Sequence, residues 1–256
     1  MKLRSARPGR ATLVATLAAV FALAAYTFSG TRAARLTRLA IEIAPTTEGL
    51  FLIRTKDLER RLDDGPYGAL TGTPIGELDV RAVEAYLEAD PFVAAAEVYL
   101  GHDGTAHVTV RQHDPILRVH DRGGADYYLA PDGTVLPLSK HAVARVPVLT
   151  GAVPGFEAAA RDSTPIPAHA LAVAVAADPL LRALTEQIDV SPAGEYTLVP
   201  KLGTGRFVLG DLRGLDDKLR RLRAFVDGVY PEKGWDYYRR VDLRYDGLAF
   251  GTKPEA

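Results

Sequence analysis

The residue types that most often perform chemistry occur in this chain without the spacing that the chemistry needs. Histidine can ligate a metal or transfer a proton, and the chain has six histidines. None belongs to an H-E-x-x-H pair, although His107 and His113 could share one face of a strand. The adjacent carboxylates Asp63–Asp64 and Asp216–Asp217 do not point at a common site, as the paired acids of a glycosidase must. These patterns indicate neither a metal centre nor an acid–base pair.

Nucleophiles and phosphate-binding loops are missing from the sequence as well. Ser139 lies in a Leu-Ser-Lys turn and not in the G-x-S-x-G turn of hydrolases. Gly203 and Gly205 enclose a single threonine, which is too short for a nucleotide-binding loop and is more simply a turn between strands. The chain has no cysteine, which excludes disulfides, thiolate catalysis and cysteine-ligated metals. We therefore predict no catalytic residue, no cofactor and no metal ligand, and interpret the chain as a binding and assembly module.

Charge is distributed unevenly along the 256 residues, which carry 31 basic and 32 acidic side chains. Residues 1–41 contain seven basic residues and no acid, which leaves 24 basic and 32 acidic residues, a net charge of −8, for the rest. Binding to nucleic acid needs a basic surface that neutralises phosphates. An acidic body therefore argues against a nucleic-acid partner, and no motif indicates a small-molecule substrate.

A membrane anchor is predicted at residues 11–30, which are twenty residues without a charge. A helix of this length spans about 30 Å, the thickness of the hydrocarbon core of a bilayer. Basic residues flank it on both sides, and Tyr26 and Phe28 lie near its distal end, where aromatic rings favour the interface. We predict that residues 1–10 are a cytoplasmic tail and that the acidic body is extracytoplasmic. A cleaved signal peptide and a buried soluble helix are the alternatives.

The first part of the body, residues 36–112, has the pattern of a small βααββ domain. Apolar and polar residues alternate over 36–43, as in a strand. Helices are predicted over 55–62 and from the cap Asp79 to about residue 89, on either side of a Gly/Pro-rich loop. Strands follow at 92–100 and 105–111, and Asp103-Gly104 between them suits a tight hairpin turn.

The second part, residues 113–250, is predicted to be a mixed β domain with flanking helices, which makes the fold class α+β. Short strands alternate with turns, a helix is predicted over 168–177, and residues 251–256 are assigned to a C-terminal tail. The clearest helix spans 217–230, where apolar residues recur every three or four positions. Its basic residues are interpreted as a solvated face: Lys218, Arg220, Arg221 and Arg223. A last strand is predicted over 239–245.

Several segments, in their order along the chain, are similar to the bacterial cell-division proteins of the FtsQ/DivIB family. The βααββ domain behind an anchor resembles the POTRA domain of that family, with LEADPFVAAAEVYL at 87–100 and HVTVRQHDPILRV at 107–119. The hairpin that opens the β domain of the family is similar to DYYLAPDGTVLPLS at 126–139, with PVLTG at 147–151. The end of that domain resembles Leu-Gly-Asp at 209–211 and RVDLRYDG at 240–247.

The resemblance implies a non-enzymatic scaffold of the division septum that binds FtsB-like and FtsL-like single-pass proteins and other divisome proteins. In the family, a final strand offers its edge to a strand of the FtsB-like partner. Here that edge would be 239–245, with Leu248 and Phe250 beyond it and the helix 217–230 behind it. Aromatic residues before the strand either join this interface or close the core of the domain. The candidate partner-binding residues are Trp235, Tyr237, Tyr238, Arg240, Val241, Asp242, Leu243, Arg244, Tyr245, Leu248 and Phe250.

The family also implies a location, the inner membrane at the division septum, with the body in the periplasm. Two other functions stay open at this point. One is a different membrane-anchored POTRA-type protein of envelope assembly, and the other is an anchored cell-wall enzyme, which would need the catalytic constellation that the sequence lacks.

Overall fold

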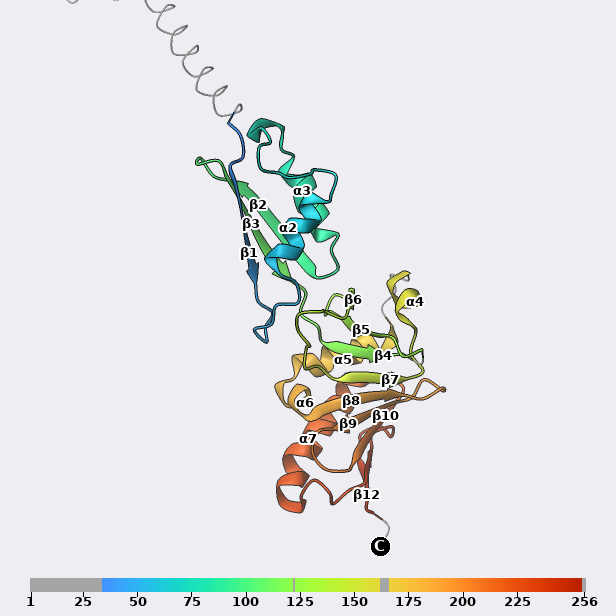
Figure 1. Ribbon diagram of the computed structural model, residues 1–256. Helices are drawn as coiled ribbons and strands as arrows, with labels where there is room; N and C mark the ends of the chain where they lie inside the picture. Colours follow the sequence, from blue (N-terminus) through green and yellow to red (C-terminus); the bar gives the residue numbers. More distant parts are fainter. Residues whose placement is uncertain (1–33, 122, 162–165, 255–256) are drawn as a thin grey trace, which may run out of the picture. The chain divides into compact units, whose positions relative to one another are not determined.

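The structure, a computed structural model, describes residues 34–121, 123–161 and 166–254 (Figure 1). The predicted cytoplasmic tail and membrane anchor, residues 1–10 and 11–30, lie outside these ranges. Within them, no helix combines the length and the apolar character needed to cross a membrane. The described chain forms two compact units, residues 34–44 with 54–111 and residues 45–53 with 112–254.

The first unit has the predicted strand–helix–helix–strand–strand order, which confirms that part of the fold prediction. Its three-stranded sheet has the order β1-β3-β2, with β1 parallel to β3. The hairpin turn contains Gly104 at a φ of 79°, a conformation that glycine adopts without strain. The elements are β1 (Arg38–Ala44), α2 (Thr55–Asp63), the 3-10 helix η1 (Ile75–Glu77), α3 (Val80–Glu88), β2 (Val93–Leu100) and β3 (Thr105–Gln112).

Amphipathic periodicity explains how the first unit packs. Leu58 and Leu62 of α2 and Val83 and Leu87 of α3 lie four residues apart on one helix face, and all four are fully buried. The side chain of Asp79 caps α3 by accepting a hydrogen bond from the backbone N–H of Ala82 at 3.1 Å, as predicted.

The second unit is built on a nine-stranded sheet with the order β12-β11-β10-β9-β8-β7-β4-β5-β6. The α+β class is thereby confirmed. Its strands are β4 (Leu117–His120), β5 (Asp126–Leu129), β6 (Val135–Pro137), β7 (Val148–Gly151), β8 (Thr185–Val190), β9 (Tyr196–Pro200), β10 (Arg206–Gly210), β11 (Arg240–Asp242) and β12 (Phe250–Thr252). Its helices are α4 (Phe156–Arg161), α5 (Pro167–Ala177), α6 (Pro179–Leu184) and α7 (Leu215–Lys233).

One face of this sheet carries the core of the second unit. Leu198, Phe207 and Val241 are buried and belong to one core cluster with Leu171 of α5 and Leu222 of α7. Figure 1 shows α5, α6 and α7 gathered along the sheet. The predicted helices at 168–177 and 217–230 are confirmed. The short helix α4 was not predicted, because the sequence pattern of its stretch indicates a surface connection.

The segment 45–53 belongs to the second unit, although it lies between β1 and α2 in sequence. The backbone N–H and the hydroxyl of Thr47 donate hydrogen bonds to the carboxylate of Asp114, at 2.7 and 2.6 Å. The side-chain amide oxygen of Gln112 accepts from the backbone N–H of Leu52 at 2.7 Å. These bonds join residues about sixty positions apart, which explains why the sequence pattern placed 45–53 in the βααββ domain.

Candidate partner-binding edge

Strand β12 forms one edge of the nine-stranded sheet. Strand β11 lies inside the sheet, because it pairs in parallel with β10 and antiparallel with β12. The prediction that 239–245 presents a free edge is therefore wrong. After Asp246-Gly247 the chain turns back and adds one more strand, which runs to Thr252 and thus into the segment assigned to a C-terminal tail. Among the described strands β12 pairs with β11 alone, so the backbone groups on its outer side, within Phe250–Thr252, form this edge.

Three large side chains stand exposed beside β12, and we call them the edge cluster: Tyr245, Leu248 and Phe250. Their exposed fractions are 54%, 53% and 48%. The rings of Tyr245 and Phe250 meet edge to face, with centroids 5.2 Å apart. Grouped apolar exposure of this kind is typical of a surface that another molecule covers.

Arg221 of α7 holds the segment that carries the edge cluster. Its guanidinium donates to the backbone carbonyl oxygens of Tyr245, at 2.8 Å, Leu243, at 3.3 Å, and Leu248. Asp217, one turn earlier on α7, accepts from Nε of Arg221 at 2.7 Å. The Arg221 side chain is only 13% exposed, so its assignment to a solvated face is wrong. Sequence reasoning missed this residue because its partners lie more than twenty positions away.

Lys218 also departs from the predicted solvated face, through a partner seven residues earlier in the chain. It is only 6% exposed, and its ammonium group donates to the backbone carbonyl oxygen of Asp211 at 2.7 Å and to the carboxylate of Asp211 at 3.1 Å. Arg220 and Arg223 do lie at the surface. The helix therefore uses two of the four basic residues at 218–223 to hold the strand ends that flank the site.

Asp242 fixes the end of β11 from which the edge segment starts. Its carboxylate is 10% exposed and accepts from the guanidinium of Arg240 at 2.8 Å and from that of Arg244 at 2.8 to 3.2 Å. Burial alone would raise the pKa of Asp242, but the hydrogen bonds from Arg244 and Arg240 outweigh it and hold the pKa below the usual 3.8. The carboxylate therefore stays ionised and keeps both arginines in place.

We expect Asp242→Asn to destabilise the second unit by about 1–3 kcal/mol at pH 7, because it removes the charged acceptor of Arg240 and leaves Arg244 with its longer ion pair to Glu195, at 3.5 Å. A carboxylate whose pKa is lower in the folded state than in the unfolded state stabilises the fold at pH values above the unfolded-state pKa. That contribution to stability is lost as the pH falls through the folded-state pKa. The difference between the variant and the parent should thus be full above about pH 4 and shrink as the pH falls below 3.8. Chemical unfolding at pH 7 and at pH 3 measures it.

Asp246→Asn is the matched control, because Asp246 is an exposed carboxylate four residues along the same segment. It should leave the stability unchanged at both pH values. An equal loss for Asp242→Asn at pH 7 and pH 3 would contradict the role assigned to the ionised carboxylate.

The aromatic candidates before β11 are divided by the structure. Trp235 stacks on Tyr230 with ring centroids 4.5 Å apart, and Tyr238 meets Phe225 edge to face at 5.4 Å. Both rings pack against the core, which agrees with the alternative that these aromatic residues close the core of the domain. Tyr237 instead lies beside Lys253, whose ammonium group is 4.8 Å from the centroid of its ring.

Gly251, in the middle of β12, is another site residue that the sequence patterns missed. A Cβ atom at this position would lie 2.4 Å from two ring carbons of Tyr238. Only glycine therefore lets the strand lie against that ring. The turn at Gly203 and Gly205 is similarly close to the 235–238 backbone, where a Cβ would come within 2.7 Å of carbonyl oxygens. The interpretation of these glycines as a turn is thus confirmed.

A basic hollow of about 860 Å³ adjoins the edge on the sheet face opposite the core. Arg206 and Arg240 are register partners on β10 and β11 and point away from the core. Arg239 and Lys253 add two more cations, and threonines supply hydroxyl groups. Neighbouring like charges repel each other, so a partner with acidic side chains would relieve this repulsion.

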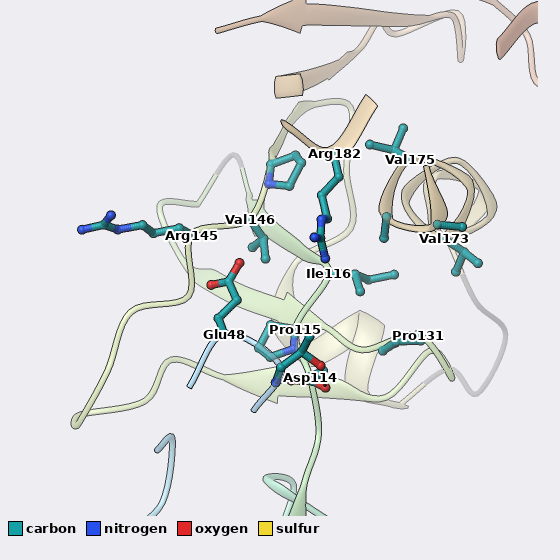
Figure 2. A pocket seen from close by; sticks show the side chains of 14 residues that line it. Glu48, Asp114, Pro115, Ile116, Pro131, Arg145, Val146, Val173, Val175 and Arg182 are labelled. Carbon is teal, nitrogen blue, oxygen red and sulfur yellow. Dashed lines mark hydrogen bonds between the residues drawn. The ribbon is translucent and has the colours of Figure 1, made fainter. Parts of the chain in front are cut away.

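A second hollow, of about 340 Å³, lies elsewhere in the second unit and has mainly apolar walls (Figure 2). The side chain of Arg182 extends into it beside Ile116, whereas Arg145 points away. Asp114 at its rim is bound to Thr47. Across the described residues, no group of three or more histidine, aspartate or glutamate side chains is placed to hold a metal ion.

Comparison with known proteins identifies the families that the two units match. Residues 114–250 match a family described as FtsQ/DivIB, C-terminal related, and residues 36–111 match the POTRA-like domain. The cell division protein FtsQ of Rhodothermus marinus is 28% identical over 180 residues, which are 68% of this chain. The matched region covers 66% of that relative, slightly less than two thirds of its length.

Proposed function

Because the chain belongs to the FtsQ/DivIB family of cell-division proteins, we propose that it is a non-enzymatic scaffold of the divisome. It binds FtsB-like and FtsL-like single-pass division proteins, and it does so by adding a strand of the FtsB-like partner to β12. The predicted anchor at residues 11–30 holds the body in the periplasm at the division septum, with the short N-terminal tail in the cytoplasm.

The observation that carries this proposal is the construction of the β12 edge. Strand addition needs an unpaired backbone for affinity and exposed side chains for selectivity. Strand β12 offers the first, and the edge cluster offers the second. The partner strand would cover Phe250 and Leu248 and bring acidic side chains toward the basic hollow.

The opposite edge of the same sheet is less suited to this task. Strand β6 is as short as β12, but it contains Pro137, which has no backbone N–H to donate. Edges of this kind resist pairing with another chain. This contrast favours β12 as the pairing edge of the second unit.

Arg221→Ala tests the proposal, because it removes the donor that holds three carbonyl groups of the 243–248 segment. We expect the full-length variant, purified from membranes of its native host, to capture about ten-fold less FtsB-like protein, which corresponds to the loss of one charged hydrogen-bond cluster. Quantitative co-purification measures this. The midpoint of unfolding should stay close to that of the parent, since the core side chains are untouched.

Arg220→Ala is the control, since Arg220 neighbours Arg221 and shares Asp217 as partner but makes no contact with the 243–248 segment among the described residues. It should capture the partner as the parent does. Capture at the parental level by both variants would refute the role of the edge. An equal loss of capture in both variants would indicate a general charge effect.

A further inference from the structure

The β2 edge of the first unit is closed by two side chains of the neighbouring helix. Strand β2 pairs with β3 alone among the described strands, so its outer backbone groups face away from the sheet. The N–H of Val98 donates to the Glu84 carboxylate at 2.8 Å, and the N–H of Ala96 donates to the Glu88 carboxylate at 3.1 Å. Two edge donors are therefore occupied within the chain.

The geometry of α3 fits this task. Residues four apart on a helix are separated by about 6 Å along the axis, and residues two apart on a strand by about 6.6 Å. Glu84 and Glu88 thus match the spacing of Val98 and Ala96 on the antiparallel strand. Each glutamate follows a fully buried residue, Val83 or Leu87, which fixes the rotation of the helix against the sheet.

Without these glutamates, β2 would be an open pairing edge. Its sequence, VAAAEVYL, spans eight residues with one charge, no lysine and no proline. Long edges of such composition pair with other strands unless they are protected. A second copy of the same strand can pair with it, because antiparallel pairing about a two-fold axis at Glu97 puts Ala96 opposite Val98. The two Glu97 carboxylates would then face and repel each other, and replacing Glu97 removes that repulsion.

We propose that Glu84 and Glu88 form an edge guard that keeps β2 from pairing with β2 of a second copy of this chain. The guard works by occupying the N–H groups of Ala96 and Val98, and not by repelling the second copy. This inference concerns the first unit and is independent of partner binding at β12.

The absence of cysteine allows a direct test in the full-length protein in its membrane. Glu97→Cys places one thiol at the two-fold axis of the paired strands, where facing Cα atoms of a non-hydrogen-bonded pair are about 4.5 Å apart and within disulfide reach. In this background, Glu84→Ala with Glu88→Ala should raise the disulfide-linked dimer about five-fold or more, because each unmade hydrogen bond frees a donor for the second copy.

Two matched variants separate the guard from general effects. Glu84→Gln with Glu88→Gln keeps an oxygen acceptor at each position, so the dimer should stay near the parental amount. Glu59→Ala with Glu77→Ala removes two charges elsewhere on the first unit and should also leave the dimer unchanged. A rise in either control equal to that of the alanine pair would overturn the proposal, because charge would then be the cause.

Hydrogen exchange at Ala96 and Val98 completes the test. We expect the alanine pair to exchange these amides at least about ten-fold faster in monomer, while Val108 and Val110 of β3 stay protected. Unchanged exchange, or faster exchange with no added dimer, would each refute the guard. If Val108 and Val110 also lose their protection from exchange, the single variant Glu84→Ala, which removes the shorter hydrogen bond, is tested instead. Its amount of disulfide-linked dimer and its hydrogen exchange then decide the proposal.

Discussion

Replacing Gly251 with alanine is expected to detach β12 from the sheet and abolish capture of the FtsB-like partner. The added Cβ would lie 2.4 Å from the ring of Tyr238. That ring cannot withdraw freely, because it packs edge to face on Phe225 at 5.4 Å and on Tyr237 at 4.8 Å. The short strand is the part that yields, and the pairing of Val241 with Gly251 is lost.

Co-purification of the FtsB-like protein with the full-length variant measures the loss, and cells that depend on the variant should grow as filaments. Gly228→Ala is the control, since Gly228 lies in α7 and a Cβ there meets nothing within 4 Å. It should bind as the parent and be slightly more stable, because alanine favours a helix. Normal capture by Gly251→Ala would mean that the partner does not need β12.

Gly151→Ala should produce the largest loss of stability, about 3 kcal/mol or more, up to failure of the second unit to fold. Gly151 has a φ of 96°, and a Cβ there would lie 2.1 Å from the carbonyl oxygen of Val190. This oxygen is part of the backbone of β8, which pairs with Gly151 on β7. Neither strand can shift without disturbing the middle of the nine-stranded sheet.

Urea unfolding followed by the fluorescence of Trp235 measures this effect, because Trp235 is the single tryptophan and packs on the core of the same unit. Gly194→Ala is the matched control, with a φ of 78° but nothing within 4 Å of the added Cβ. It should lose only about 1–2 kcal/mol, the cost of the left-handed backbone. Equal losses at the two glycines would show that backbone conformation, and not crowding, dominates at Gly151.

Local patterns were sufficient to predict most elements of both units but not their neighbours in the sheet. The helix that became α7 was predicted correctly, because five apolar residues repeat at helical spacing. Strand β12 was missed, because Phe-Gly-Thr is short and glycine interrupts its alternation. Whether β11 is an edge depends on β12 and β10, so the error at one strand caused the error at the other.

The candidate site divides in the same way. Tyr245, Leu248 and Phe250 were predicted from sequence and are exposed beside the edge, although their binding role stays a prediction. Arg221 and Lys218 could not be found, since a basic stripe on a helix resembles a solvated face until the backbone carbonyl groups that its side chains bind are known. Burial and hydrogen bonds to backbone carbonyl groups distinguish Arg221 and Lys218 from Arg220 and Arg223, whose side chains are exposed.

The placement of residues 45–53 has a consequence for how this chain can be divided. No single cut yields two complete pieces, because the loop that carries the buried Leu52 precedes α2 but folds with the second unit. A fragment that begins at Gln112 would lack that loop and leave Asp114 without Thr47. Recombination between relatives would therefore have to transfer both segments together, and the two halves of this protein would be inherited as one block.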